Sequence, residues 1–148
     1  MARIGIITCS NMTNDLACSS FKCLENSHNG KGTFARYAEQ GGAQVVGVIS
    51  CSGCPTLIAP EKIVRRVRTL VSSGVDAIHF ANCLEKICPF RKKYLSILQE
   101  EFPETEFVNG THEPLTEEEE AVVGAFVHQG LCQRNTTMAD LMESRKER

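Results

Sequence analysis

The sequence contains no tryptophan and only two tyrosines, so it offers few rings on which a flavin or a nucleotide base could stack. It also lacks an excess of either charge, and a formal net charge of −2 predicts no general attraction to nucleic acid or to an anionic membrane. No apolar run reaches the roughly 18 residues of a membrane-spanning helix. The first residues lack the apolar core of about 7–15 residues that marks a secretory signal, and we therefore expect a cytoplasmic protein.

Cysteine, by contrast, is frequent, with eight among 148 residues. This share is below the roughly 8–10 per cent that is typical of disulfide scaffolds, and a chain of this length can build a core without disulfides. In a reducing cytoplasm such cysteines more often bind metals or take part in catalysis. Their function therefore depends on where the fold places them.

Segments with the patterns of strands and helices alternate along the chain. Strands are predicted at residues 3–8, 43–50, 75–81 and 105–109, and helices at 34–39, 61–73 and 90–102. Thr116 and Glu119 form a capping box for a last helix. This order favours an α/β fold, a single three-layer domain whose four-stranded parallel sheet has flanking helices and is flavodoxin-like, with strand order 2-1-3-4.

We expect this domain to cover residues 1–132 and a charged, loosely held tail to cover residues 133–148. The connection from Cys9 to Thr33 has no clear core pattern. Irregular connections of such length are uncommon in compact domains and are often functional. This connection contains Cys18 and Cys23, which could hold it in place.

Most cysteines lie where a predicted strand ends. Parallel strands all end at one edge of the sheet, about 4.8 Å from their neighbours, and ligands bind at this edge. The candidate metal ligands that the fold would bring to this edge are Cys9, Cys18, Cys23, Cys51, Cys54, Cys83, Cys88 and His112. Helix N-termini at the same edge would lower the pKa values of these thiols.

Thiolates that are held together repel one another, and a bound cation removes this repulsion. The pairs Cys51/Cys54, Cys18/Cys23 and Cys83/Cys88 have spacings at which one metal ion or cluster can bind both sulfurs. We predict a metal ion as the partner of this protein. Zinc is favoured slightly because His112 is available, while the dense cysteines and the Cys88-Pro89 pair also suit an iron–sulfur cluster.

Four residues of the same chemical types are assigned other roles. His79 lies in the middle of a strand and is predicted to be a hydrogen-bonded core histidine. His28 is expected in a solvated loop and His128 on a helix surface, while Cys132 follows the last helix and is expected to be structural.

The motifs resemble those of the CGGC-domain family. The resemblance covers about residues 3–112 and rests on R-I-G-I-I-T-C at 3–9, Cys18 and Cys23, F-A-R-Y at 34–37, C-S-G-C-P at 51–55, I-H-F-A-N-C at 78–83, C-P at 88–89 and G-T-H at 110–112. It implies metal binding, with zinc suggested, by the eight candidate ligands named above. Ser52 departs from the Cys-Gly-Gly-Cys that gives the family its name.

Two alternatives remain open. Cys51 and Cys54 could form the redox pair of a thiol–disulfide oxidoreductase, although this use leaves the other cysteines of the edge unexplained. The hydroxyl-rich loop at residues 8–14 could hold the phosphate of a flavin or nucleotide, but residues 29–33 lack the first glycine of a P-loop. Whether the protein is an enzyme, and whether it has a protein partner, does not follow from the sequence.

Overall fold

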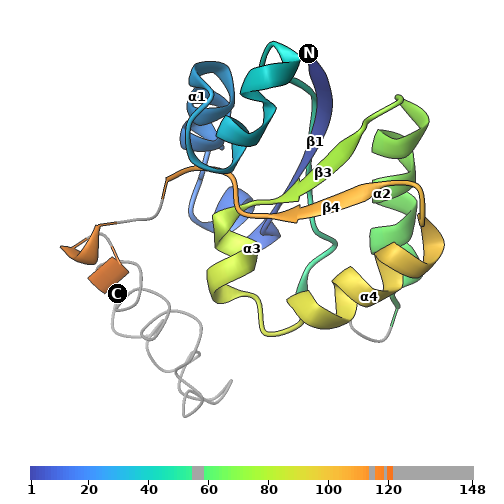
Figure 1. Cartoon of the computed structure of the whole chain (residues 1–148). Helices are drawn as coiled ribbons and strands as arrows, with labels where there is room; N and C mark the ends of the chain where they lie inside the picture. Colours follow the sequence, from blue (N-terminus) through green and yellow to red (C-terminus); the bar gives the residue numbers. More distant parts are fainter. Residues whose placement is uncertain (55–58, 114–115, 119, 122–148) are drawn as a thin grey trace, which may run out of the picture. The chain divides into compact units, whose positions relative to one another are not determined.

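The structure, a computed structural model, describes residues 1–54, 59–113, 116–118 and 120–121 (Figure 1). The chain divides into two compact units, Met1–Glu113 and Pro114–Arg148. In the first unit, four parallel strands form one sheet in the order β2-β1-β3-β4. These strands are β1 (Ala2–Thr8), β2 (Ala43–Ser50), β3 (Ala77–Phe80) and β4 (Glu106–Asn109). The predicted sheet, its parallel direction and its strand order are confirmed.

Helices cover both faces of this sheet, which gives the predicted three layers (Figure 1). On one face, α2 (Glu61–Ser72) and α4 (Arg91–Glu101) bury Ile63, Val67 and Leu98 against the strands. On the other, α1 (Phe21–Asn29) and the 3₁₀ helix η2 (Gly32–Gln40) bury Cys23, Phe34 and Tyr37. A π-helical turn, η1 (Asn11–Asp15), follows β1, and α3 (Asn82–Ile87) follows β3.

Two glycines allow α2 to lie close to the sheet. Gly5 and Gly47 are partners in the register of β1 and β2. A Cβ atom at either position would lie 2.8 Å from a methyl group of Leu70, closer than real Cβ atoms approach a neighbour. The absence of these two side chains therefore brings α2 near the strands whose ends carry Cys9 and Cys51.

The predicted elements differ from the structure mainly between Cys9 and Thr33, where α1 was not predicted. This helix buries Cys23, Asn26 and Ser27 and exposes Phe21 and Leu24, so its apolar residues face away from the core. The periodicity that identifies an amphipathic helix is therefore missing from its sequence. For the same reason, His28 lies in the last turn of a helix, not in a loop, although it is exposed as expected.

In the second unit, residues 117, 118, 120 and 121 are helical, and the backbone N–H of Glu120 donates to the carbonyl oxygen of Thr116. The last helix therefore begins where the capping box predicts. His128, Cys132 and the predicted domain end at residue 132 lie outside the described residues. None of the helices described in the structure is long and apolar enough to cross a membrane.

Candidate functional site

The ends of the strands bring candidate ligands to one edge of the sheet. Cys9 directly follows β1 and Cys51 directly follows β2, while Cys83 lies in the first turn of α3 behind β3. Thr111 and His112 follow β4. At this edge the sulfurs divide between the two faces of the sheet, which the strand pattern alone did not predict.

Three thiols, Cys9, Cys51 and Cys88, lie in or against the hydrophobic cluster that α2 and α4 cover, and Cys54 lies near Cys88. We call these four thiols the α2/α4 group. Cys9 and Cys51 are buried in the hydrophobic cluster of this face, and Cys88 packs against that cluster. Cys54 is exposed, and Asn11 donates a hydrogen bond to its sulfur at 3.5 Å. Cys88 lies near enough to Cys51 and Cys54 for their charges to raise its pKa, although burial is the larger cause.

Cys51 is the thiol of this group that the structure stabilises as a thiolate. Its sulfur accepts a hydrogen bond from the Cys9 thiol and others from the backbone N–H groups of Ser10, at 3.4 Å, and Gly53. The Ser10 hydroxyl oxygen lies 3.6 Å from the same sulfur. Together these donors lower the pKa of Cys51 to about 5, against the effect of burial.

Cys9 is the donor in this pair and has the opposite shift. Because its thiol proton is shared with Cys51 and its surroundings are buried, the pKa of Cys9 is raised. This hydrogen bond therefore favours the proton on Cys9 and the negative charge on Cys51. The donors to Cys51 lie between β1 and η1, where Cys9 and the N-cap residue Ser10 stand, and in the Cys51–Cys54 loop, and none comes from α2, which begins at Glu61.

We call the remaining candidate ligands the α1/η2 group: Cys18, Cys23, Cys83 and His112. Cys23 lies in the hydrophobic cluster that α1 and η2 cover, while Cys83 packs against the clusters of both faces. Cys23 is buried, and its sulfur lies 3.2 Å from the Thr111 hydroxyl. Burial raises the pKa of Cys23, with a further rise from nearby Cys18. Burial also raises the pKa of Cys83 to about 11, although the Cys9 N–H donates to its sulfur at 3.2 Å.

Asn82, which the sequence analysis did not single out, holds the turn that carries His112. Its side-chain oxygen accepts the Thr111 N–H at 2.7 Å, and its side-chain nitrogen donates to the His112 carbonyl at 3.2 Å. Nδ1 of His112 lies 2.8 Å from the Glu113 carbonyl oxygen and 3.2 Å from the side-chain nitrogen of Asn82. In the tautomer whose Nδ1 donates to Glu113, this histidine presents Nε2 as its acceptor atom, as many metal-binding histidines do, whereas a hydrogen bond from Asn82 requires the proton on Nε2.

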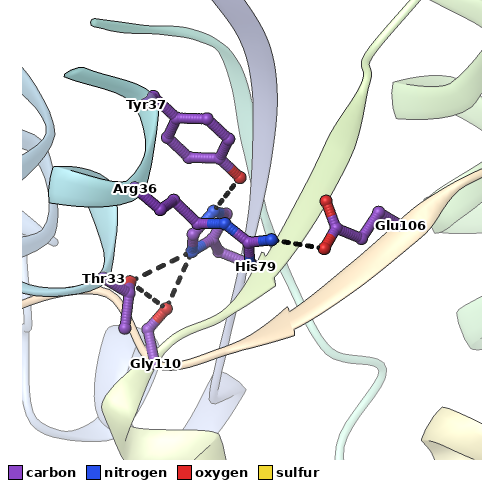
Figure 2. Close-up of polar contacts among 6 residues, drawn as sticks. All are labelled: Thr33, Arg36, Tyr37, His79, Glu106 and Gly110. Carbon is purple, nitrogen blue, oxygen red and sulfur yellow. Dashed lines mark hydrogen bonds and ion pairs between the residues drawn. The ribbon is translucent and has the colours of Figure 1, made fainter. Parts of the chain in front are cut away.

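His79 is the hydrogen-bonded core histidine that was predicted (Figure 2). Its Nε2 lies 2.8 Å from the Tyr37 hydroxyl, and its Nδ1 lies 2.9 Å from the Gly110 carbonyl oxygen and 3.2 Å from the Thr33 hydroxyl. Burial lowers its pKa to about 4, so the ring is neutral and donates from Nδ1 to Gly110. His79 thus fixes the backbone just before Thr111 and His112 and is no candidate ligand.

Within the described residues, no three side chains of cysteine, histidine, aspartate or glutamate lie close enough together to hold one metal ion. The kinds of donor fit a soft metal, because thiolates and an imidazole are its preferred ligands. The candidate ligands that contact one another do so in pairs. One such pair is Cys9 and Cys51, whose thiols share a hydrogen bond. A four-ligand site would require the exposed Cys54 and the half-buried Cys88 to approach this pair.

The model of the CGGC domain matches residues 3–112 of the chain. The chain belongs to the CGGC-domain family. The match covers both groups of thiols and ends at His112, so all eight candidate ligands of this CGGC domain lie within it. Comparison with curated proteins and with solved structures gave no match.

Where the name of the CGGC family has glycine, this chain has Ser52, and the structure shows a consequence. The Ser52 hydroxyl oxygen is buried and has no hydrogen-bond partner among the described residues. A buried hydroxyl without a partner destabilises the fold by about 1–3 kcal/mol. The loop between Cys51 and Cys54 therefore has an unused donor beside the thiolate.

Proposed function

We propose that this CGGC-domain protein binds a soft metal ion through the α2/α4 group, with Cys51 as the first ligand. The observation that carries this is the set of hydrogen bonds to the Cys51 sulfur, which lies beside Cys9 at the sheet edge with Cys88 packed against the same cluster. A metal ligand must be deprotonated, and a thiol whose pKa is near 5 is already so at neutral pH. Cys9, Cys54 and Cys88 would complete a four-sulfur site.

Cys18, Cys23, Cys83 and His112 would form a second site on the other face. Binding there must release protons from Cys23 and Cys83, whose pKa values are raised, just as binding to the α2/α4 group must release them from Cys9 and Cys88. Only the α2/α4 group also contains a thiol with a lowered pKa, Cys51, and we therefore propose that metal binding begins there at neutral pH. In the tautomer that donates from Nδ1 to the Glu113 carbonyl, His112 would be a ligand through Nε2.

Zinc is the metal that we favour, because it accepts both four-sulfur and mixed sulfur–imidazole sites. A bound zinc ion would neutralise the clustered thiolates and crosslink the strand ends. An iron–sulfur cluster in an electron-transfer protein is the alternative for the same cysteines. We also propose a cytoplasmic location, since free thiols in this number persist in reducing compartments.

Metal analysis of the full-length protein, purified without oxygen and without chelators, tests this function. We expect zinc in a colourless sample, and a fall in zinc content in Cys51→Ser. Cys132→Ser is the matched control, because Cys132 is outside the predicted ligand set. Iron with acid-labile sulfide would identify an iron–sulfur cluster in place of zinc. Protein free of metal would overturn the proposal.

A further inference from the structure

The ends of β1 and β2 bring Cys9 and Cys51 alongside each other. Thr8 and Ser50 are partners in the parallel register, and the Cys51 N–H donates to the Thr8 carbonyl at 2.8 Å. The ladder therefore continues by one residue beyond both strands. Neighbouring strands are about 4.8 Å apart, which falls within the roughly 4.4–6.8 Å between the Cα atoms of a disulfide.

The side chains of these two cysteines also point the same way. Both are buried in the hydrophobic cluster under α2 and α4, and they are hydrogen-bonded to each other. Two thiols in direct contact, on adjacent strands and in register, need little movement to form a bond.

Cys54, the other cysteine of the Cys-Ser-Gly-Cys motif, has different surroundings from Cys51. Cys51 is 7% exposed, whereas Cys54 is exposed and its sulfur accepts a hydrogen bond from the side chain of Asn11. Between them, Gly53 has a φ of 95°, so the chain turns through a conformation that favours glycine. The motif therefore presents one sulfur to the core and one to the surface.

We propose that Cys51 and Cys9, not Cys51 and Cys54, form a reversible disulfide by exchange with a low-molecular-weight disulfide. The Cys51 thiolate attacks one sulfur of this disulfide, forms a mixed disulfide and releases the first thiolate. Cys9 then loses its proton to that thiolate or to solvent and attacks the Cys51 sulfur, which releases the second thiol. Two protein thiols are oxidised, and one external disulfide is reduced to two thiols.

The hydrogen bonds at Cys51 suit the attacking role, and the position of Cys9 suits the resolving role. Ser10 and Gly53 donate to Cys51 from the backbone, which stabilises the attacking thiolate. Cys9 lies next to the sulfur that it must attack in the second step. This reaction uses no metal ion and can be tested on the metal-free protein.

The test treats full-length protein, reduced and freed of metal with a chelator, with oxidised glutathione. After the remaining thiols are alkylated, mass spectrometry of non-reduced peptides locates the bonds. We expect a Cys9–Cys51 link without bound glutathione. In Cys9→Ser, we expect glutathione to remain on Cys51, because the resolving thiol is missing. Cys54→Ser is the matched control and should form the same Cys9–Cys51 link as the unchanged protein.

A Cys51–Cys54 link in the unchanged protein would overturn the proposal. So would a Cys9→Ser protein that keeps its circular-dichroism spectrum yet holds no glutathione on Cys51. The metal content of the same preparation is measured before chelation. Failure of the disulfide and failure of metal binding are therefore separate results.

Discussion

The two groups of thiols at the sheet edge differ in how the protein treats their charge. In the α2/α4 group, Cys51 accepts hydrogen bonds from Cys9 and from two backbone N–H groups, and its pKa falls to about 5. In the α1/η2 group, Cys23 is buried and Cys83 is half-buried, both have fewer donors, and their pKa values rise. Cys51 is thus the thiol whose charge the fold favours, whereas its neighbours Cys9 and Cys88 have raised pKa values, like Cys23 and Cys83.

The difference follows from where the backbone turns after each strand. After β1, the Ser10 N–H at the start of η1 donates a hydrogen bond to the Cys51 sulfur. After β2, the Gly53 N–H donates a second one. After β4, the turn at Thr111 brings one hydroxyl, and no backbone N–H of that turn, within 3.2 Å of the Cys23 sulfur among the contacts described. Strand order determines which residues meet, while the local turns determine which of them are charged.

The largest expected effect is the titration of Cys51. In metal-free, reduced protein, the ultraviolet absorbance of thiolates should show a step of one thiol with a midpoint near pH 5, because the pKa of Cys51 is lowered to about 5. Cys51→Ser should remove this step, and Cys9→Ala should move its midpoint upward by removing the thiol donor. Cys23→Ser, from the other face, should leave it unchanged. A step that persists in Cys51→Ser would assign the thiolate to another cysteine.

The next effect concerns His79, whose burial under α1 and η2 keeps its imidazole ring neutral. Its pKa is lowered to about 4 in the folded protein, from 6.5. The unfolded chain therefore binds the proton more readily, and the stability that the neutral ring contributes is present above pH 6.5 and lost as the pH falls toward 4. The full loss is about 3 kcal/mol.

Urea unfolding at several pH values measures this dependence. His79→Gln cannot titrate and can still hydrogen-bond, so the difference in unfolding free energy between the two proteins should vary across this pH range. Tyr37→Phe provides a second check, since it leaves the buried Nε2 of His79 without its partner at an expected loss of about 1–3 kcal/mol. Parallel pH profiles for the unchanged protein and His79→Gln would show that His79 does not titrate there.

A smaller effect is expected from the turn that carries His112. Thr111→Val keeps the shape of this fully buried side chain and removes the hydroxyl that contacts Cys23 and Asn82. We expect a loss of about 1–2 kcal/mol in the free energy of unfolding. Thr105→Val, before β4, is the control and should change it less. If Thr111→Val shifts the titration of Cys51, the two faces are coupled and the distinction between them fails.

The sequence was sufficient to predict the sheet and its edge, because strands buried on both faces appear as apolar runs. The run that contains Ile4, Ile6 and Ile7 and the short strand around His79 were identified in this way. Helix α1 could not be identified, since its buried positions are Cys23, Asn26 and Ser27. A pattern of apolar residues does not reveal a helix whose buried face is polar.

The sequence also could not predict how the thiols divide between the two faces of the sheet. Side chains alternate strictly only within a strand, and Cys9, Cys51 and Cys83 all lie just past a strand end. There, the direction of a sulfur depends on the turn that follows. Two of the donors to Cys51 are backbone N–H groups, and these leave no signature in the residue types except for Gly53, whose φ is positive.

The smallest expected effect tests the loop between the two cysteines of the motif. Because the Ser52 hydroxyl is buried without a partner in the described part of the chain, Ser52→Ala should stabilise the metal-free protein by about 1 kcal/mol. Ser52→Gly, which restores Cys-Gly-Gly-Cys, should gain less, since glycine loses roughly 0.5–1 kcal/mol through backbone freedom. Thermal unfolding of both variants, with and without zinc, measures these differences. If the hydroxyl instead donates a hydrogen bond to metal-bound thiolates, Ser52→Ala will stabilise only the metal-free form. A loss of stability in the metal-free form would show that the Ser52 hydroxyl already has a hydrogen-bond partner.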